Sequence, residues 1–120
     1  MKKIILKVHN TEIQATLNNT IAAKDFYLRL PLILKFTDSG VDYSTQYQQG
    51  KYTIEEMQRG WENWDIVWNG GFLSIIYYDE KYSQCYNVMV IGHIEKEDLK
   101  ILRNLPKEVL LEFKPVKILC

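Results

Sequence analysis

The chain lacks three features that would direct it to particular classes of protein. Neither sign of charge is in excess, because 15 basic residues balance 15 acidic ones, so no net field attracts nucleic acid or an anionic membrane. The two cysteines, Cys85 and Cys120, are too few for the disulfide framework of a small secreted domain. Long apolar runs are absent, and the run from Ile4 to Leu6 ends at Lys7. These absences predict a cytoplasmic protein with free thiols and with neither nucleic-acid nor membrane partners.

The composition that remains is that of a globular protein. Apolar residues make up 47% of the chain and charged residues 25%. A chain of 120 residues is the size of one domain and buries roughly two-thirds of its unfolded surface. We therefore expect a single domain over residues 1–120.

The most informative segment runs from Trp64 to Tyr78. It consists of two apolar, β-branched and aromatic runs, WDIVW and FLSIIYY, separated only by Asn69-Gly70-Gly71. Each run has the length of a strand, and the two glycines supply the positive φ that a tight turn requires. The segment predicts two core strands joined by a hairpin turn.

Three helices are predicted from apolar spacing and end signals. An apolar stripe from Ala23 to Leu30 follows the N-cap candidate Thr20 and ends at Pro31, which predicts a helix over 21–29. The pair Thr53 and Glu56 matches a capping box and predicts a short helix over 54–59. Glu97 and Asp98 precede Lys100 and Arg103, which is the order of charges that the helix dipole favours, and this predicts a third helix from residue 97 to about 105.

The remaining strands follow from alternating or continuous apolar runs. Gly92 lies within one of these runs, which indicates a bulge, a bend or a close backbone approach. The polar, tyrosine-rich segment 41–51 alternates weakly and is interpreted as an irregular or edge strand. The predicted strands, beyond the two already described, are 4–8, 12–17, 32–37, 87–95 and 109–113.

The order of these elements has no regular alternation of strands and helices. It favours an α+β domain or a closed β-barrel with a few covering helices. Closure would also remove the exposed edges that so many apolar strands otherwise present.

The succession of motifs along the chain resembles the small bacterial cyclophilin-like proteins. The motifs are an N-terminal hairpin, AAKDF over 22–26, LPLIL over 30–34, DIVW over 65–68, FLSIIYY over 72–78 and IGHI over 91–94. This resemblance covers nearly the whole chain. It implies a mainly β fold, namely a closed eight-stranded antiparallel barrel with two or three covering helices.

The resemblance does not extend to the activity of the cyclophilin prolyl isomerases. Those enzymes carry a strand arginine and a Phe-x-Met-x-Gln-Gly-Gly-Asp run, whereas Arg29, Arg59 and Arg103 here fall on or beside predicted helices, and Asp65 is the nearest remnant of that run. The prediction is therefore a non-enzymatic module that binds a peptide or small molecule without a cofactor. The alternative is a divergent prolyl isomerase.

Aromatic side chains are the candidates for the ligand site, beside the tyrosine-rich segment. Tyrosine and tryptophan combine a large apolar area with a polar group, which suits ligand clefts. The aromatic group also contains Tyr52, Trp61, Trp64 and Phe72, and core or turn packing is the favoured explanation for Trp64, Trp68 and Phe72. Exposed aromatics would alternatively form the face of a weak homodimer in a protein that is otherwise a monomer. The predicted ligand-binding residues are Tyr43, Tyr47, Trp68, Tyr78 and His93.

No residue pattern predicts a catalytic or metal site. His93 has no second ligand at metal spacing, and Cys85 has no neighbouring base. The adjacent carboxylates Asp79 and Glu80 are interpreted as solvated loop charges.

Overall fold

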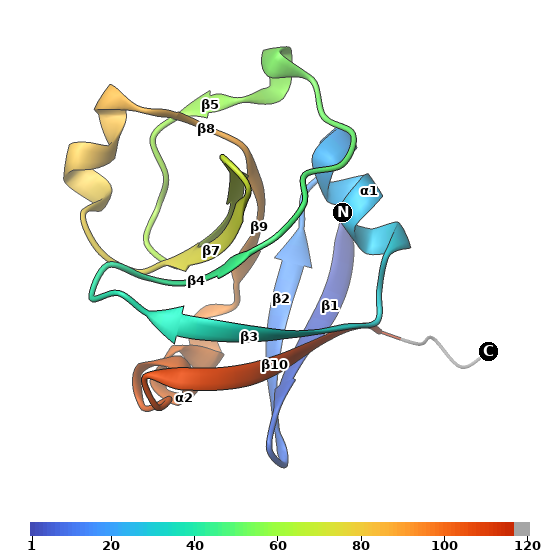
Figure 1. The fold of residues 1–120 in the computed structure, drawn as a ribbon, viewed down its shortest axis with the longest axis vertical. Coiled ribbons are helices and arrows are strands. Elements are labelled where there is room, and N and C mark those ends of the chain that lie inside the picture. Colours follow the sequence, from blue (N-terminus) through green and yellow to red (C-terminus); the bar gives the residue numbers. More distant parts are fainter. Residues whose placement is uncertain (117–120) are drawn as a thin grey trace.

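Eight strands close into an antiparallel barrel in the computed structural model, which describes residues 1–116 (Figure 1). Their bounds are β1 Lys2–Val8, β2 Thr11–Leu17, β3 Leu32–Asp38, β4 Asp42–Gln46, β6 Asp65–Asn69, β7 Phe72–Ile76, β9 Val90–Ile94 and β10 Glu108–Pro115. Around the barrel they pair in the order β1, β10, β3, β4, β7, β6, β9 and β2. The predicted fold class is confirmed.

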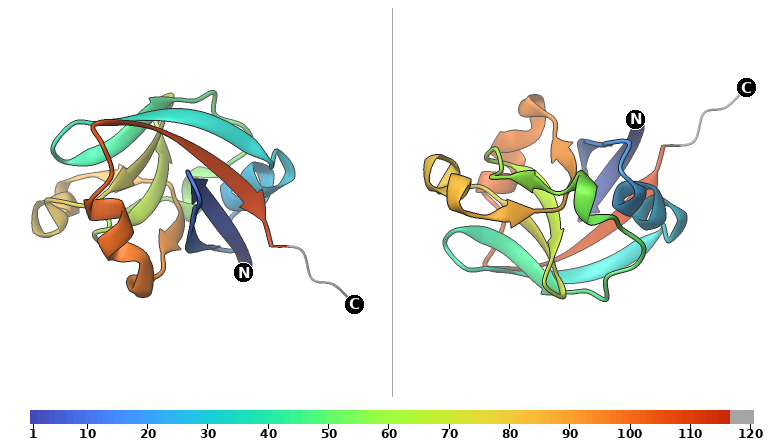
Figure 2. Two further views of the ribbon diagram at one scale, coloured as in Figure 1. Left: turned by 90° about the horizontal axis from the view of Figure 1, so that it is seen from below. Right: turned by 90° about the horizontal axis from the view of Figure 1, so that it is seen from above.

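The shorter elements cover the barrel or extend from it. They are the helices α1 Ile21–Leu28 and α2 Leu99–Arg103, the 3-10 turns η1 Ile54–Glu56, η2 Glu80–Cys85 and η3 Lys96–Asp98, and the two-stranded ribbon of β5 Gln58–Arg59 with β8 Asn87–Val88. The two helices lie on opposite sides of the barrel in Figure 1 and in the left view of Figure 2. Within residues 1–116, no helix has the length and apolar character needed to cross a membrane.

The predicted pair of core strands forms the hairpin of β6 and β7. Asn69 pairs with Phe72, so the turn consists of Gly70 and Gly71, at φ +59° and +83°. Positive φ at both central residues produces the twist that matches the flanking strands. The prediction is confirmed, although β7 ends at Ile76 and leaves Tyr77 and Tyr78 outside it.

The core fills the barrel with side chains that alternate along the strands. Tyr43, Ile75 and Ile66 lie in one inward-facing row, because Ile75 pairs with both of the others. From α1, Phe26 packs edge-on against Phe113 and Tyr47, at ring centroid distances of 5.6 and 5.8 Å. This helix therefore closes one end of the core.

Two side chains cap the N-terminus of α1. One of them, Glu56, was predicted to cap a different helix. Thr20 Oγ1 accepts a hydrogen bond from the Ala23 N–H at 3.1 Å, as the N-cap pattern predicts. Glu56 Oε1 accepts from the Ile21 N–H at 2.8 Å, whereas Thr53 makes no side-chain cap. The capping box at Thr53 is therefore wrong, because the Glu56 carboxylate caps α1. The predicted helix over 54–59 shortens to η1 followed by β5.

Two further segments differ from the sequence prediction. The segment predicted to be an irregular or edge strand contains β4, which is not an edge strand because it pairs with β3 on one side and with β7 over five residues on the other. The predicted strand 87–95 is two strands, β8 and β9, separated by Met89. The interpretation of Gly92 as a close backbone approach is confirmed, because a Cβ built there would lie 2.6 Å from the Thr16 carbonyl oxygen.

Candidate functional site

A cleft of about 810 Å³ lies on the outer face of the barrel, and we call it the outer cleft. Its floor is formed by residues of β4, β6 and β7, and its walls by Trp61, η2 and β8. The floor residues are Asp42, Ser44, Val67, Asn69, Phe72, Ser74 and Ile76, and Val41, which precedes β4, also lines the cleft. The wall residues are Trp61, Asp79, Tyr82, Cys85, Tyr86, Asn87 and Val88.

Strand alternation explains the chemistry of the floor. Ser74 pairs with Ser44 on one side and with Val67 on the other, so the three side chains form one outward-facing row. The neighbouring row places Asp42 beside Ile76. Apolar and hydrogen-bonding groups therefore alternate across the floor.

The walls are aromatic and fixed by hydrogen bonds. The rings of Trp61 and Tyr86 are nearly parallel, at 24° and with centroids 6.2 Å apart. The indole N–H of Trp61 donates to the Tyr78 carbonyl at 3.2 Å, and its backbone N–H donates to Ser83 Oγ at 2.9 Å. Ser83 is fully buried, so it ties Trp61 to η2 in a site that excludes water. The aromatic wall is therefore pre-formed.

The outer cleft is acidic. Asp42 and Asp79 supply two carboxylates, and none of the cleft residues found within 1–116 is a lysine, arginine or histidine. Ser39 Oγ donates to Asp42 Oδ1 at 2.5 Å, which holds this carboxylate in position without neutralising it. Over the described part of the chain, neither aspartate forms an ion pair.

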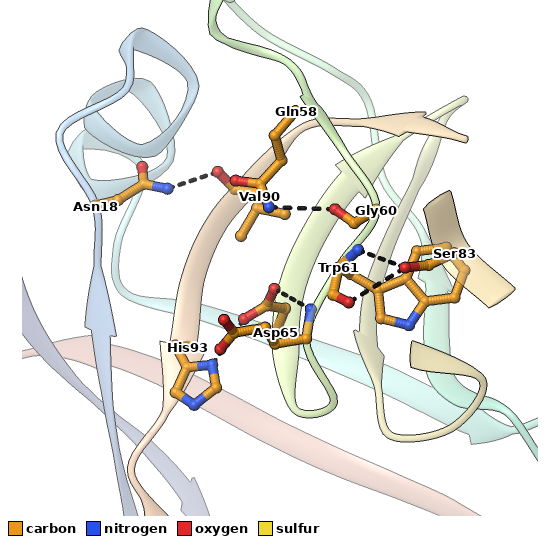
Figure 3. A network of polar contacts seen from close by, with 9 residues as sticks. Asn18, Gln58, Gly60, Trp61, Asp65, Ser83, Val90 and His93 are labelled. Atoms are coloured by element: carbon orange, nitrogen blue, oxygen red, sulfur yellow. Dashed lines mark hydrogen bonds and ion pairs between the residues drawn. The ribbon is translucent and has the colours of Figure 1, made fainter. Parts of the chain in front are cut away.

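A second polar group, drawn in Figure 3, supports the turn that carries Trp61. His93 Nδ1 lies 2.7 Å from Asp65 Oδ1, and Asp65 Oδ2 accepts from the Glu62 N–H at 2.8 Å. Asp65 is buried, and Trp64 beside it has φ +76°. A tryptophan is rarely found at positive φ, and this turn is held by the hydrogen bonds of Asp65 together with backbone hydrogen bonds that join Trp64 to Ile76 and Ile94.

Glu62, Asp65 and His93 are also the one group in residues 1–116 that could hold a metal ion, with ligand atoms within 4.8 Å of one another. Both oxygens of Asp65 already accept hydrogen bonds from the protein. The geometry therefore fits a positioning role for Asp65 without an ion. Spacing along the sequence could not reveal this group, because strand pairing brings Asp65 and His93 together.

The Asp65–His93 pair predicts a pH dependence of stability. The hydrogen bond to Asp65 raises the pKa of His93 above 6.5, although burial opposes it, and the Asp65, Glu62 and Glu95 charges add to the rise. The folded state thus holds the proton more tightly than the unfolded state. The stabilisation is complete below pH 6.5 and disappears as the pH rises through the folded-state pKa.

We expect His93→Gln to lose stability relative to the wild type below pH 6.5, with the difference shrinking toward alkaline pH. Urea unfolding between pH 5.5 and 9 measures this difference. His9→Gln is the matched control, because His9 is exposed in the β1–β2 turn. A difference for His93→Gln that does not change with pH would contradict the assignment.

The predicted ligand-binding residues are spread over several environments, and none of them lines the outer cleft. Tyr43 and Trp68 are 3% and 1% exposed inside the barrel, and Tyr43 also lines a second cavity, of about 120 Å³, with Trp64 and Arg103. Burial raises the pKa of the Tyr43 hydroxyl, which donates to the Leu105 carbonyl at 3.1 Å. Tyr47 packs edge-on against Trp68, with ring centroids 5.6 Å apart, and lies beneath the guanidinium of Arg29. Tyr78 is 58% exposed, and its carbonyl accepts the hydrogen bond from the indole N–H of Trp61.

The sequence analysis identified some of the residues that line the outer cleft and missed others. Trp61 and Phe72 belong to the aromatic group identified from the sequence, and Phe72 is exposed at the cleft rather than packed in the core. Tyr82 was missed because residues 79–84 were interpreted as a polar loop, and Cys85 and Tyr86 because they fall between that loop and the predicted strand 87–95. The two tyrosines, Tyr82 and Tyr86, were the signal in the sequence that could have identified this wall of the cleft. Cys85 is an exposed free thiol, as predicted, and Cys120 lies outside the described residues.

The family model described as the Cyclophilin-like family matches residues 6–114. No curated protein matches the chain.

Proposed function

The chain belongs to the cyclophilin-like family, and we propose that it is a binding module whose outer cleft takes a short peptide segment. The single observation that carries this proposal is the outer cleft itself. Its volume of about 810 Å³ lies within the roughly 300–1,000 Å³ typical of ligand sites. That space suits a few residues of an extended chain rather than one side chain.

The lining matches the chemistry of a peptide. Phe72 and the small exposed parts of Val67, Ile76 and Val88 offer apolar contact, while Ser44 and Ser74 offer hydroxyl groups that can donate and accept hydrogen bonds. A peptide presents apolar side chains together with amide N–H and C=O groups that need partners. The alternation on the floor supports such a ligand better than a purely apolar one.

Binding is a better-supported proposal than prolyl isomerisation. Rotation about the peptide bond faces a barrier of ~18 to 20 kcal/mol, and lowering it calls for a donor aimed at the proline amide. The three arginines lie at the end of α1, on β5 and at the end of α2, which are not barrel strands. Arg59 on β5 departs from the prediction, because this residue lies on the ribbon rather than beside a helix.

We expect Tyr86→Ala to abolish most peptide binding, because Tyr86 supplies half of the stacked aromatic wall. The measurement is selection of an N-acetylated random hexapeptide library on immobilised protein, followed by sequencing of the retained peptides. Tyr52→Ala is the matched control, since Tyr52 is an exposed tyrosine outside the cleft. Tyr86 is 60% exposed, so its removal costs little stability.

Alkylation of Cys85 gives an independent readout, because this thiol lines the outer cleft. In a Cys120→Ser background, a retained peptide should slow the reaction of Cys85 with iodoacetamide. Peptides that are enriched equally on wild type and Tyr86→Ala, or no enriched peptide at all, would overturn the proposal. Retention of small organic molecules with no enriched peptide would assign the cleft to a small ligand instead.

A further inference from the structure

We propose that the peptide held in the outer cleft presents a lysine or arginine side chain to it. This inference rests on the proposed function and names the chemistry that selects the ligand. It follows from three features of the cleft: its carboxylates, its aromatic wall and its apolar floor. Each feature contributes to the recognition of a long cationic side chain.

The carboxylates come from two different parts of the chain. Asp42 projects from the floor in the row shared with Ile76, and Ser39 Oγ fixes it there. Asp79 lies at the N-terminal end of η2, in the left-handed conformation with φ +65°. With no basic side chain among the cleft residues of the described chain, this charge favours a ligand that brings its own cation.

The aromatic wall adds a second attraction for a cation. Ring faces attract ammonium and guanidinium groups, most strongly where water is displaced. One ring of this wall already makes such a contact, because Lys81 Nζ lies 5.0 Å from the centroid of Tyr82. The stacked rings of Trp61 and Tyr86 offer a further surface of the same kind.

Two arginines of this chain also lie over aromatic rings, outside the outer cleft. The Arg29 guanidinium lies 5.2 Å from the ring centroids of both Tyr47 and Trp68, and that of Arg103 lies 5.9 Å from the ring of Trp64. Both arginines are thus committed to other aromatic groups. In the outer cleft, Lys81 lies over the ring of Tyr82, whereas no basic side chain of residues 1–116 lies over the stacked rings of Trp61 and Tyr86, which are left for a partner.

The apolar floor completes the fit. Lysine and arginine bury their alkyl stems along apolar surfaces while the charged group stays near polar partners. Phe72, which is 46% exposed, supplies such a surface in the floor, together with the small exposed parts of Val67, Ile76 and Val88. A shorter cation or a purely apolar side chain would use only part of these contacts.

The experiment compares two pentapeptides that differ by one charge. The probes are Ac-Ala-Leu-Lys-Leu-Ala-NH2 and the same peptide with norleucine in place of lysine, titrated calorimetrically into the full chain. We expect the lysine peptide to bind about tenfold more tightly at low salt, and this advantage to fall as salt is raised. Asp42→Asn and Asp79→Asn should each reduce the advantage about threefold. Glu97→Gln, an exposed acid outside the cleft, should leave it unchanged.

The outcomes separate this inference from the proposed function. Equal binding of the two peptides would overturn the cationic specificity while the cleft remained a peptide site. Failure of both peptides to bind and to protect Cys85 would overturn this inference, and failure of the hexapeptide selection would overturn the proposed function. If n-butylammonium binds as tightly as the lysine peptide, the cleft selects a free amine, and the peptide assignment is wrong.

Discussion

Trp68→Ala is expected to lower the free energy of unfolding by about 3 to 5 kcal/mol. The indole is 1% exposed inside the barrel, packs edge-on against Tyr47 and lies beneath the guanidinium of Arg29. Its removal leaves a large cavity that the closed barrel cannot collapse to fill. Such a loss is a large part of the total stability of a domain of this size, about 5 to 15 kcal/mol. Urea unfolding followed by circular dichroism measures it.

Two variants show whether this loss reflects core packing. Trp68→Phe keeps most of the apolar volume and removes an indole N–H that has no hydrogen-bond partner among residues 1–116, so it should cost much less. Tyr78→Ala should change stability by no more than about 0.5 kcal/mol, because that ring is exposed. If Trp68→Ala keeps the wild-type midpoint and only weakens ligand binding, Trp68 is a surface ligand contact and the core assignment is wrong.

Gly92→Ala is expected to cost about 3 kcal/mol, a large effect for one methyl group. The added Cβ would lie 2.6 Å from the Thr16 carbonyl oxygen and 3.2 Å from Leu17 Cα, and both of these atoms belong to the backbone of β2. A rotamer change cannot relieve this contact, so β2 and β9 must separate where Leu17 pairs with Gly92. Thermal unfolding should show a fall of several degrees in Tm.

Gly40→Ala is the matched control for this effect. A Cβ at Gly40 would meet no atom within 4 Å, although φ of +93° makes alanine unfavourable there. We expect a cost of about 1 kcal/mol from the backbone conformation alone. Equal losses of stability for Gly92→Ala and Gly40→Ala would contradict a steric role for Gly92.

The barrel could be predicted from the sequence because its signals are local. The two runs flanking Asn69-Gly70-Gly71 have the composition and length of strands, and the glycines match the turn that joins β6 to β7. Apolar alternation likewise marks β2 in the first hairpin. Closure could be expected because it leaves none of these apolar strands with an open edge.

The location of the site could not be predicted, because it depends on which face of each strand points outward. Tyr43 looks like an exposed tyrosine in a polar segment, yet alternation turns it inward and turns Asp42 and Ser44 toward the cleft. A tyrosine can be buried there because its hydroxyl reaches the Leu105 carbonyl, a contact across 62 residues of sequence. The wall of the cleft depends in the same way on the pairing of β5 with β8.

The most direct test of the account follows the three tryptophan indole N–H resonances while the lysine pentapeptide is added. Trp61 lines the outer cleft, Trp68 lies in the core and Trp64 lies near α2, so each resonance reports on a different region. The resonance of Trp61 is assigned as the one that is missing from the spectrum of the Trp61→Phe variant. We predict that the Trp61 resonance shifts saturably while that of Trp68 stays in place. A shift of Trp68 with an unchanged Trp61 would place the ligand beside Tyr47 and contradict the account.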